Sequence, residues 1–329
     1  MSVISFENPP IIKSFASIAG QKESKGPLKG LFDVTLNDDL AGKESFEKAE
    51  SEMVKTVVNL AFQKADFMAT DIDYLIGGDL LNQCSASTFG VRDLKVPFLG
   101  IYGACSTMAQ GIVLSSVLAT SSYAKNVACF ASSHFCAAEK QFRYPLEYGG
   151  QRAKTCQWTV TGAGSLVVST FGNGVKIKSA SVGKICDLGI TDSNNMGAAM
   201  APAATRTLVD FFNETGKDPN EYDLIVTGDL AYEGVKLTRE LAAQEGVFLG
   251  KNYTDCGLII YDREKQDVHA GGSGCGCSAV VLTSFILPRM LAGVYKKVIF
   301  VGTGALMSPT TVLQKESIPG IAHLVELEY

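Results

Sequence analysis

The sequence predicts an α/β protein made of two duplicated halves. Two observations support this fold class: short apolar runs typical of buried strands alternate with helical segments, and the same motifs occur twice in the same order. Alternating strands and helices are typical of a parallel or mostly parallel sheet that is covered on both faces. We place the boundary near Asn173, which gives an N-terminal half of residues 1–173 and a C-terminal half of residues 174–329.

Apolar spacing predicts the elements of the first half. Residues 45–65 carry apolar side chains at helical spacing, so we expect a helix there. Residues 21–39 are polar and contain turn residues, which predicts an excursion on the surface. A short helix is expected over 83–91 and a buried helix over 112–119. The apolar runs that predict strands are 11–19, 74–78, 96–101, 127–131 and 161–171.

The second half repeats these elements in order. A helix over 203–214 precedes the second copy of the 74–78 strand, and a helix over 274–291 corresponds to the one at 112–119. Each match is weak alone, but the shared order indicates a duplication. The matching strand segments are 12–17 with 177–182, 73–80 with 223–230, and 125–130 with 296–301.

Composition excludes several classes of function. The net charge of −5 is mild and no basic stripe occurs, so we expect no nucleic-acid partner. No stretch approaches the ~20 apolar residues that cross a bilayer, and the first residues lack the pattern of a signal peptide. The nine cysteines are odd in number and scattered through apolar runs, which fits a reducing compartment better than a disulfide framework.

We expect no cofactor and no metal site. Cys275 and Cys277 form a C-x-C pair, but no second pair has zinc spacing with it. The glycine run 271–276 breaks the G-x-G-x-x-G order of dinucleotide-binding proteins. Close packing is the better explanation of both features. The glycine-rich segment 302–306 follows a strand, and we expect it to close a pocket as a loop from the second half.

Cys105 is the main candidate for chemistry. It lies between the strand at 96–101 and the helix at 112–119, at a turn where a strand leads into a helix. The N–H groups and dipole of a helix N-terminus favour negative charge, which predicts a thiolate with a lowered pKa. The other interpretation is a small, buried, inert cysteine.

The duplication, with a cysteine at the start of the first central helix, resembles the thiolase and ketoacyl-synthase superfamily over nearly the whole chain. The resemblance implies a five-layer αβαβα fold and a homodimer. Within the superfamily the chain is most similar to the SpoVAD family of sporulation proteins. The segments that carry this similarity are GGDLLNQ (77–83), GACSTM (103–108), SSHF (132–135), EKQFRYP (139–145) and QWTVTG (157–162).

The catalytic partners expected from the superfamily are missing. The resemblance implies that condensing enzymes of this superfamily share a His after the second-half strand and an Asn or His at the start of the second-half helix. Here those positions hold Thr227-Gly228-Asp229 and the segment 274–278, without either residue. Asp229 would oppose a developing enolate. We therefore expect no enzyme and treat Cys105 as a vestigial nucleophile position.

Three functions are kept open. The SpoVAD resemblance implies a protein that binds dipicolinic acid (pyridine-2,6-dicarboxylate), free or as its calcium chelate, for uptake into the developing spore. It further implies a peripheral protein of the spore inner membrane that works beside the SpoVA membrane proteins. One alternative is a thiolase-like acyltransferase that uses Cys105 with His134 or His269 as the base. The other is an assembly component with a vestigial pocket.

The candidate ligand-binding residues all have polar or charged side chains, and they lie in or near the quoted motifs. Cys105 marks a helix N-terminus, which suits an anion, and two arginines, Arg143 and Arg152, suit carboxylates. An aspartate, Asp79, would suit calcium. The other interpretations are that the arginines pair with Glu139 or Glu147, and that Asp79 and Asp229 cap helices. The full set is Cys105, His134, Asp79, Asn82, Arg143, Arg152 and His269.

Overall fold

A computed structural model describes residues 3–143 and 152–329 of the chain. Its largest feature is a twelve-stranded mixed sheet in the order β11-β10-β13-β14-β9-β2-β8-β6-β4-β5, with β1 added to β9 and β3 to β2. Strands β7 and β12 form a separate small sheet. The strands are β1 (Val3–Ser5), β2 (Ile11–Ala19), β3 (Val34–Thr35), β4 (Tyr74–Gly78), β5 (Phe98–Gly100), β6 (Asn126–Ser133), β7 (Trp158–Thr159), β8 (Gly162–Ser169), β9 (Val175–Ser181), β10 (Leu224–Thr227), β11 (Tyr253–Asp255), β12 (Gly272–Ser273), β13 (Lys297–Ala305) and β14 (Gly320–Glu328).

The strand order is symmetrical about the middle of the sheet. From the centre outwards, β2-β8-β6-β4-β5 on one side matches β9-β14-β13-β10-β11 on the other. The two sides join where Ile11 pairs with Lys176 and Ile12 pairs with Val175. This symmetry follows the order of the repeated sequence motifs, and the expected boundary near Asn173 lies between β8 and β9.

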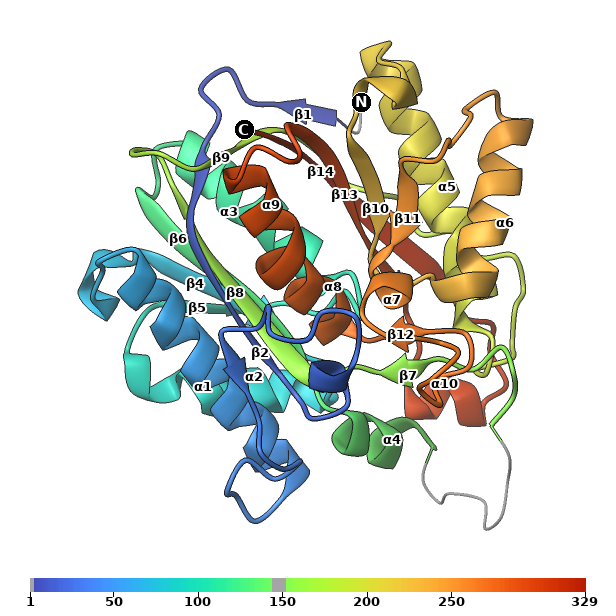
Figure 1. The fold of residues 1–329 in the computed structure, drawn as a ribbon, viewed down its shortest axis with the longest axis horizontal. Helices are drawn as coiled ribbons and strands as arrows, with labels where there is room; N and C mark the ends of the chain where they lie inside the picture. Colours follow the sequence, from blue (N-terminus) through green and yellow to red (C-terminus); the bar gives the residue numbers. More distant parts are fainter. Residues whose placement is uncertain (1–2, 144–151) are drawn as a thin grey trace.

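Helices form three layers with the two half-sheets between them (Figure 1). In the middle layer, α3 contacts both β6 of the first half-sheet and β13 of the second, and α8 packs beside it. Helices α1 and α2 cover the outer face of one half-sheet, whereas α5 and α6 cover the other. The expected αβαβα fold is therefore confirmed. The helices are α1 (Phe46–Lys64), α2 (Ser85–Val91), α3 (Thr107–Thr120), α4 (Phe135–Arg143), α5 (Met196–Thr215), α6 (Ala231–Gln244), α7 (Cys256–Ile259), α8 (Cys275–Val281), α9 (Leu287–Leu291) and α10 (Pro309–Leu313).

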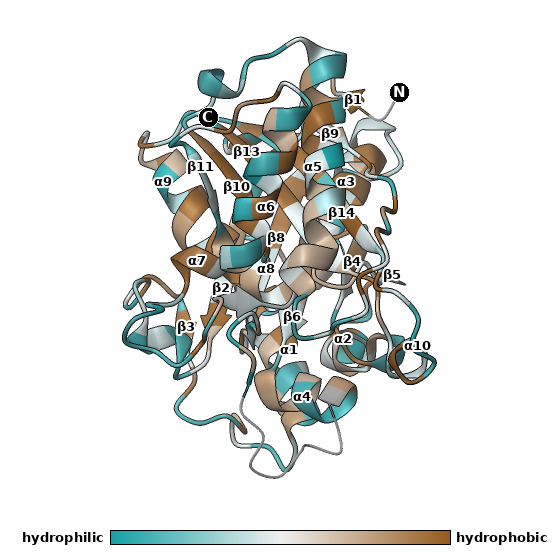
Figure 2. Cartoon of the chain, turned by 90° about the vertical axis from the view of Figure 1, so that its right-hand side faces the viewer, coloured by the Kyte–Doolittle hydropathy of each residue, from teal (hydrophilic) through white to brown (hydrophobic). Residues whose placement is uncertain are grey.

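Burial of apolar surface holds these layers together. The largest core cluster includes the buried faces of α3 and α8, and further clusters lie under α5 and under α1. Hydrophobic residues concentrate on the strands, while the outer helix α6 alternates hydrophobic and hydrophilic residues (Figure 2). Within the described residues, no helix has both the length and the apolar character needed to cross a membrane. All nine cysteines are free thiols.

Most predicted elements are present in the structure. Strands β2 and β4 have the predicted bounds, and Ser45 caps α1 by accepting a hydrogen bond from the Lys48 N–H. The expected helix over 274–291 is helical from Cys275 to Leu291, with a π-helical segment at Leu282–Ile286 between α8 and α9.

Two predictions at this level are wrong. The segment 302–306 is not a loop, because β13 continues to Ala305 in antiparallel pairing with β14. The segment 21–39 is not wholly on the surface, because Glu23 and Leu28 are buried.

The glycines of β13 bring the second half-sheet against the turn at Cys105. A Cβ atom at Gly304 would lie 2.4 Å from the carbonyl oxygen of Gly103, and one at Gly302 would lie 2.6 Å from the Cβ of Ala109. Only glycine permits this approach, so β13 sets the position of the turn.

We expect Gly304→Ala to destabilise the protein by about 1–3 kcal/mol, because the new methyl group overlaps backbone that cannot move independently. Urea unfolding measures the change. Gly100→Ala is the matched control, since its Cβ would have no neighbour closer than 3.4 Å. Equal stability of the two variants would contradict the packing argument.

Candidate functional site

Cys105 lies in a tight turn between β5 and α3. Ala104 has φ of 49°, a left-handed conformation that is unusual for a residue with a side chain. The hydroxyls of Ser106 and Thr107 donate hydrogen bonds to the carbonyl oxygens of Gly103 and Ala104 at 2.6 Å each. These local bonds stabilise the turn, and strained backbone of this kind is often found at functional sites.

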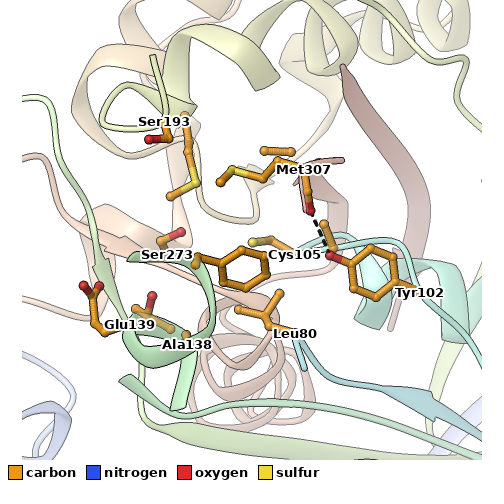
Figure 3. A pocket seen from close by; sticks show the side chains of 13 residues that line it. Leu80, Tyr102, Cys105, Ala138, Glu139, Ser193, Ser273 and Met307 are labelled. Carbon is orange, nitrogen blue, oxygen red and sulfur yellow. Dashed lines mark hydrogen bonds between the residues drawn. The ribbon is translucent and has the colours of Figure 1, made fainter. Parts of the chain in front are cut away.

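The turn forms one side of a cavity that both halves and α4 build (Figure 3). Apolar side chains and a few hydroxyls line it, with Glu139 at the side formed by α4. Ala305 at the end of β13 lies on the wall, so the expectation that this segment closes the pocket from the second half is confirmed. The lining residues are Leu80, Tyr102, Ala104, Cys105, Ala138, Glu139, Phe142, Thr159, Ser193, Met196, Ser273, Ala305 and Met307.

A buried carboxylate controls the thiol of Cys105. The carboxylate of Asp229 accepts hydrogen bonds from Thr303 Oγ1 at 2.8 Å, from Ser273 Oγ at 3.1 Å and from the Gly274 N–H at 3.0 Å. Its charge also acts on the nearby thiol of Cys105. Asp229 is fully buried. Burial raises the pKa of its carboxyl group, and the hydrogen bonds from Thr303, Gly274 and Ser273 offset part of this rise.

The expected lowering of the Cys105 pKa is wrong. Burial raises the pKa of the Cys105 thiol well above its ordinary value, and the nearby charge of Asp229 raises it further. The backbone N–H of Gly274 lowers the pKa, but by less than these two effects raise it. Cys105 is therefore held as a neutral thiol rather than a thiolate.

Asp229 also caps a different helix from the one expected. Its carboxylate accepts the N–H of Gly274 at the start of α8. Asp255 instead accepts the N–H groups of Leu230 and Ala231 at the start of α6. Burial raises the pKa of Asp255 to about 7, while hydrogen bonds from Thr227 and the backbone lower it and the charge of Asp229 raises it.

Neither candidate histidine faces Cys105. His134 Nε2 lies 2.7 Å from the carbonyl oxygen of Asp39, and its Nδ1 accepts the Cys136 N–H at 3.2 Å. His269 Nδ1 lies 2.7 Å from the carbonyl oxygen of Ala153, and its Nε2 lies 3.1 Å from Asp267. Neither ring lines the cavity. His323 lies in β14, as the sequence predicts.

The arginines occupy other positions. Arg152 pairs with Asp267 at 2.6 Å, rather than with Glu139, and its guanidinium lies 4.7 Å from the centre of the Trp158 ring. The structure thus brings Arg152 and His269 together at Asp267, away from the cavity lining. Arg143 ends α4, but its side chain lies outside the described residues, as does Glu147.

Asp79 and Asn82 lie beside the cavity rather than in it. Asp79 is buried and accepts the N–H groups of Leu81 at 2.8 Å and of Ser87 at 2.7 Å, which agrees with a capping role. The Asn82 N–H donates to Gln141 Oε1 at 3.0 Å. Asn82 lines an adjoining hollow that shares Leu80, Tyr102, Phe142 and Met307 with the main cavity.

Sequence reasoning missed most of the lining. Thr159, Ser193 and Ser273 supply hydroxyl groups, and Met196 and Met307 supply flexible apolar surface. Thr159 and Ser273 lie in segments that the sequence analysis singled out, 157–162 and 271–276, but neither residue was a candidate for binding. Among the described lining residues no Lys, Arg or His occurs, and the described part of the chain holds no group of three His, Cys, Asp or Glu that could bind a metal ion.

Comparison with known proteins gives one full-length family match. The model of the family described as stage V sporulation protein AD matches residues 1–328. Stage V sporulation protein AD of Bacillus subtilis (strain 168) is 45% identical over 323 residues, which cover 98% of this chain and 95% of that protein.

Solved structures show the same fold at low sequence identity. The 3-oxoacyl-[acyl-carrier-protein] synthase III of Aquifex aeolicus VF5 matches with a TM-score of 0.61 and 12% identity, covering 97% of this chain and 100% of its own. A variant of Xanthomonas campestris OleA matches with a TM-score of 0.62 and 12% identity, covering 99% of this chain and 100% of its own. These similarities concern the fold alone.

We expect Asp229→Asn to increase alkylation of Cys105. The substitution removes the negative charge that raises the thiol pKa, and each unit by which the pKa falls gives on the order of tenfold more thiolate at a given pH. Iodoacetamide labelling over a pH series, read by mass spectrometry on the peptide that contains Cys105, measures the change. The buried Cys129 in the same digest is the internal control, because Asp229 is not among the groups that shift its pKa. Unchanged labelling of Cys105 would show that Asp229 does not control it.

Proposed function

Because the chain belongs to the stage V sporulation protein AD family, we propose that this sporulation protein with a thiolase-like fold binds dipicolinic acid for its uptake into the developing spore and catalyses no condensation. One observation carries the proposal: Asp229 holds Cys105 as a buried neutral thiol at the cavity wall. The cavity therefore keeps the shape of a ligand site while its nucleophile is suppressed.

The charges around Cys105 oppose acyl condensation. Such chemistry needs donors or positive charge where an enolate or oxyanion develops. Here a carboxylate, Asp229, contacts the thiol, and the rings of His134 and His269 are engaged by main-chain carbonyls elsewhere. The described lining thus supplies no histidine base for the thiol.

The lining suits a small flat ligand of low net charge. Phe142 and Met307 offer apolar surface, and the hydroxyls of Thr159 and Ser193 can donate to carboxylate oxygens. Two carboxylates without a cation are costly to bury, whereas a calcium chelate of the dicarboxylate carries no net charge. The proposal therefore favours the calcium chelate over the free dianion.

Titration calorimetry with pyridine-2,6-dicarboxylate, with and without calcium, tests the proposal. We expect saturable binding of the 2,6-isomer, stronger with calcium, and none of the 3,4-isomer. Ser193→Trp should reduce affinity at least tenfold because the indole fills the cavity. Asn194→Trp is the matched control, since Asn194 is the exposed neighbour in the same loop and does not line the cavity.

Two results would contradict this function. Equal affinity of the Ser193→Trp and Asn194→Trp variants would place any bound ligand outside the cavity. Incubation with acyl-CoA that gives turnover and an acyl adduct on Cys105 would instead support a thiolase-like acyltransferase.

We further propose a homodimer that forms through β5. Among the strands of residues 3–143 and 152–329, β5 ends the sheet and pairs with β4 alone, which leaves its outer edge without a strand partner there. Leu99 on this strand is 48% exposed, and Phe89 of the neighbouring α2 is 57% exposed. Pairing of two such edges would bury these side chains and fix Tyr102, which follows β5 and lines the cavity.

Leu99→Lys tests the dimer. We expect it to convert the dimer into a monomer, because a lysine on the strand would put two charges into the interface. Sedimentation equilibrium measures the mass. Leu188→Lys, at an apolar residue that is 70% exposed in a loop of the second half, is the control and should leave the dimer intact. A wild-type protein that is monomeric at all concentrations would refute the interface.

The partners and location remain those that the family implies. We propose that the protein is peripheral to the spore inner membrane and works beside the SpoVA membrane proteins. The support for this part is family membership alone.

A further inference from the structure

Helix α4 forms a separate wall of the Cys105 cavity. It contributes Ala138, Glu139 and Phe142 to the lining, and it lies at one end of the molecule (Figures 1 and 2). Its neighbours are α1, α10 and β7. Two hydrogen bonds of the Gln141 side chain hold the last turn of α4. Its Nε2 donates to the Leu80 carbonyl at 2.8 Å, and its Oε1 accepts the Asn82 N–H.

The first turn of α4 depends on a neutral histidine. His134 precedes the helix, is 1% exposed, and accepts the Cys136 N–H at its Nδ1. Its Nε2 lies 2.7 Å from the Asp39 carbonyl, an acceptor, so Nε2 must carry the proton. Thr161 Oγ1 accepts the Phe135 N–H at 3.1 Å. These two side chains satisfy two of the four N–H groups that a helix start leaves free.

Protonation of His134 would remove one of these contacts. An imidazolium carries a hydrogen on both nitrogens, so Nδ1 could no longer accept the Cys136 N–H. The new positive charge would also lie at the positive end of the helix dipole. The protonated ring would therefore repel the helix start that the neutral ring caps.

The charged groups around His134 do not reverse this effect. Burial lowers the pKa of His134, while Asp39 in the preceding loop and Glu47 of α1 act in the opposite direction. Glu47 pairs with Lys140 of α4 at 2.7 Å, and Cys136 and Glu139 complete the titratable groups on the facing part of α4. Because the folded pKa lies below the ordinary value, the docked wall loses stability as the pH falls below about 6.5.

We propose that His134 is a positioning residue whose neutral ring holds α4 against the cavity, and that its protonation releases this wall and weakens ligand binding. The part that concerns ligand rests on the proposed function. The part that concerns α4 does not, because it can be observed without ligand.

Trp158 provides the ligand-free observation. It is the only tryptophan in the chain, and its ring stacks on Phe135, the first residue of α4, with centroids 3.8 Å apart and planes 4° apart. Release of the first turn would break this stack and change the tryptophan emission. Fluorescence between pH 8 and pH 5 therefore reports on the docking of α4.

The variants separate capping from titration. Wild-type protein should show one emission transition. The His134→Asn variant should show none, because Asn caps helices but does not titrate in this range. His323→Asn, at the other buried histidine, should keep the transition. Thr161→Val removes the other side-chain acceptor and should move the transition to higher pH. This variant tests the same wall if His134→Asn does not fold.

Ligand binding completes the test. We expect the affinity of wild-type protein for pyridine-2,6-dicarboxylate to fall at least fivefold from pH 7.5 to pH 5.5, and that of His134→Asn to change less than twofold. An emission transition without any ligand binding would support the role of His134 and refute the proposed ligand. Binding that is equal at both pH values, or a transition that persists in His134→Asn, would overturn the positioning role.

Discussion

The carboxylate of Asp229 is the interaction on which the site depends. It joins the end of β10 to β13 through Thr303, to the start of α8 through Gly274, and to the turn before α3 through Cys105. Two strands of the second half-sheet and the segments that precede both central helices therefore meet around one buried carboxylate. In a condensing enzyme this point must favour an anionic intermediate, whereas here it already holds an anion. The same carboxylate that organises the centre of the fold also raises the pKa of the Cys105 thiol, in addition to the effect of burial.

Local sequence signals predicted the fold well because they depend on neighbouring residues. Strands β2 and β4 were predicted at their observed bounds, since each is an apolar run with clear limits. The end of β13 was missed because its glycines form a strand only through pairing with β14, which is a contact with a later part of the chain. The burial of Glu23 was missed for a similar reason, since it accepts hydrogen bonds from Tyr261 and Thr161.

The site was harder to predict than the fold. The sequence identified Cys105 and the missing His and Asn, but the position of Asp229 beside the thiol required the folded chain. The partners of His134 and His269 are main-chain carbonyls of Asp39 and Ala153, and such groups have no sequence signature. The hydroxyl of Ser193 gave no signal either, because serine is common in loops. The sequence could establish which residues are missing, and the structure added which groups surround the remaining cysteine.

The shared middle layer has a consequence for the origin of the fold. Each half contributes one central helix, and α3 of the first half packs against β13 of the second as well as against its own β6. A single half would leave that helix with one apolar face in water. A protein of half this length could have been stable only as a pair of identical chains. Gene fusion would then have joined a pair that already existed, and the two central segments could afterwards diverge into a cysteine turn and a glycine-rich helix start.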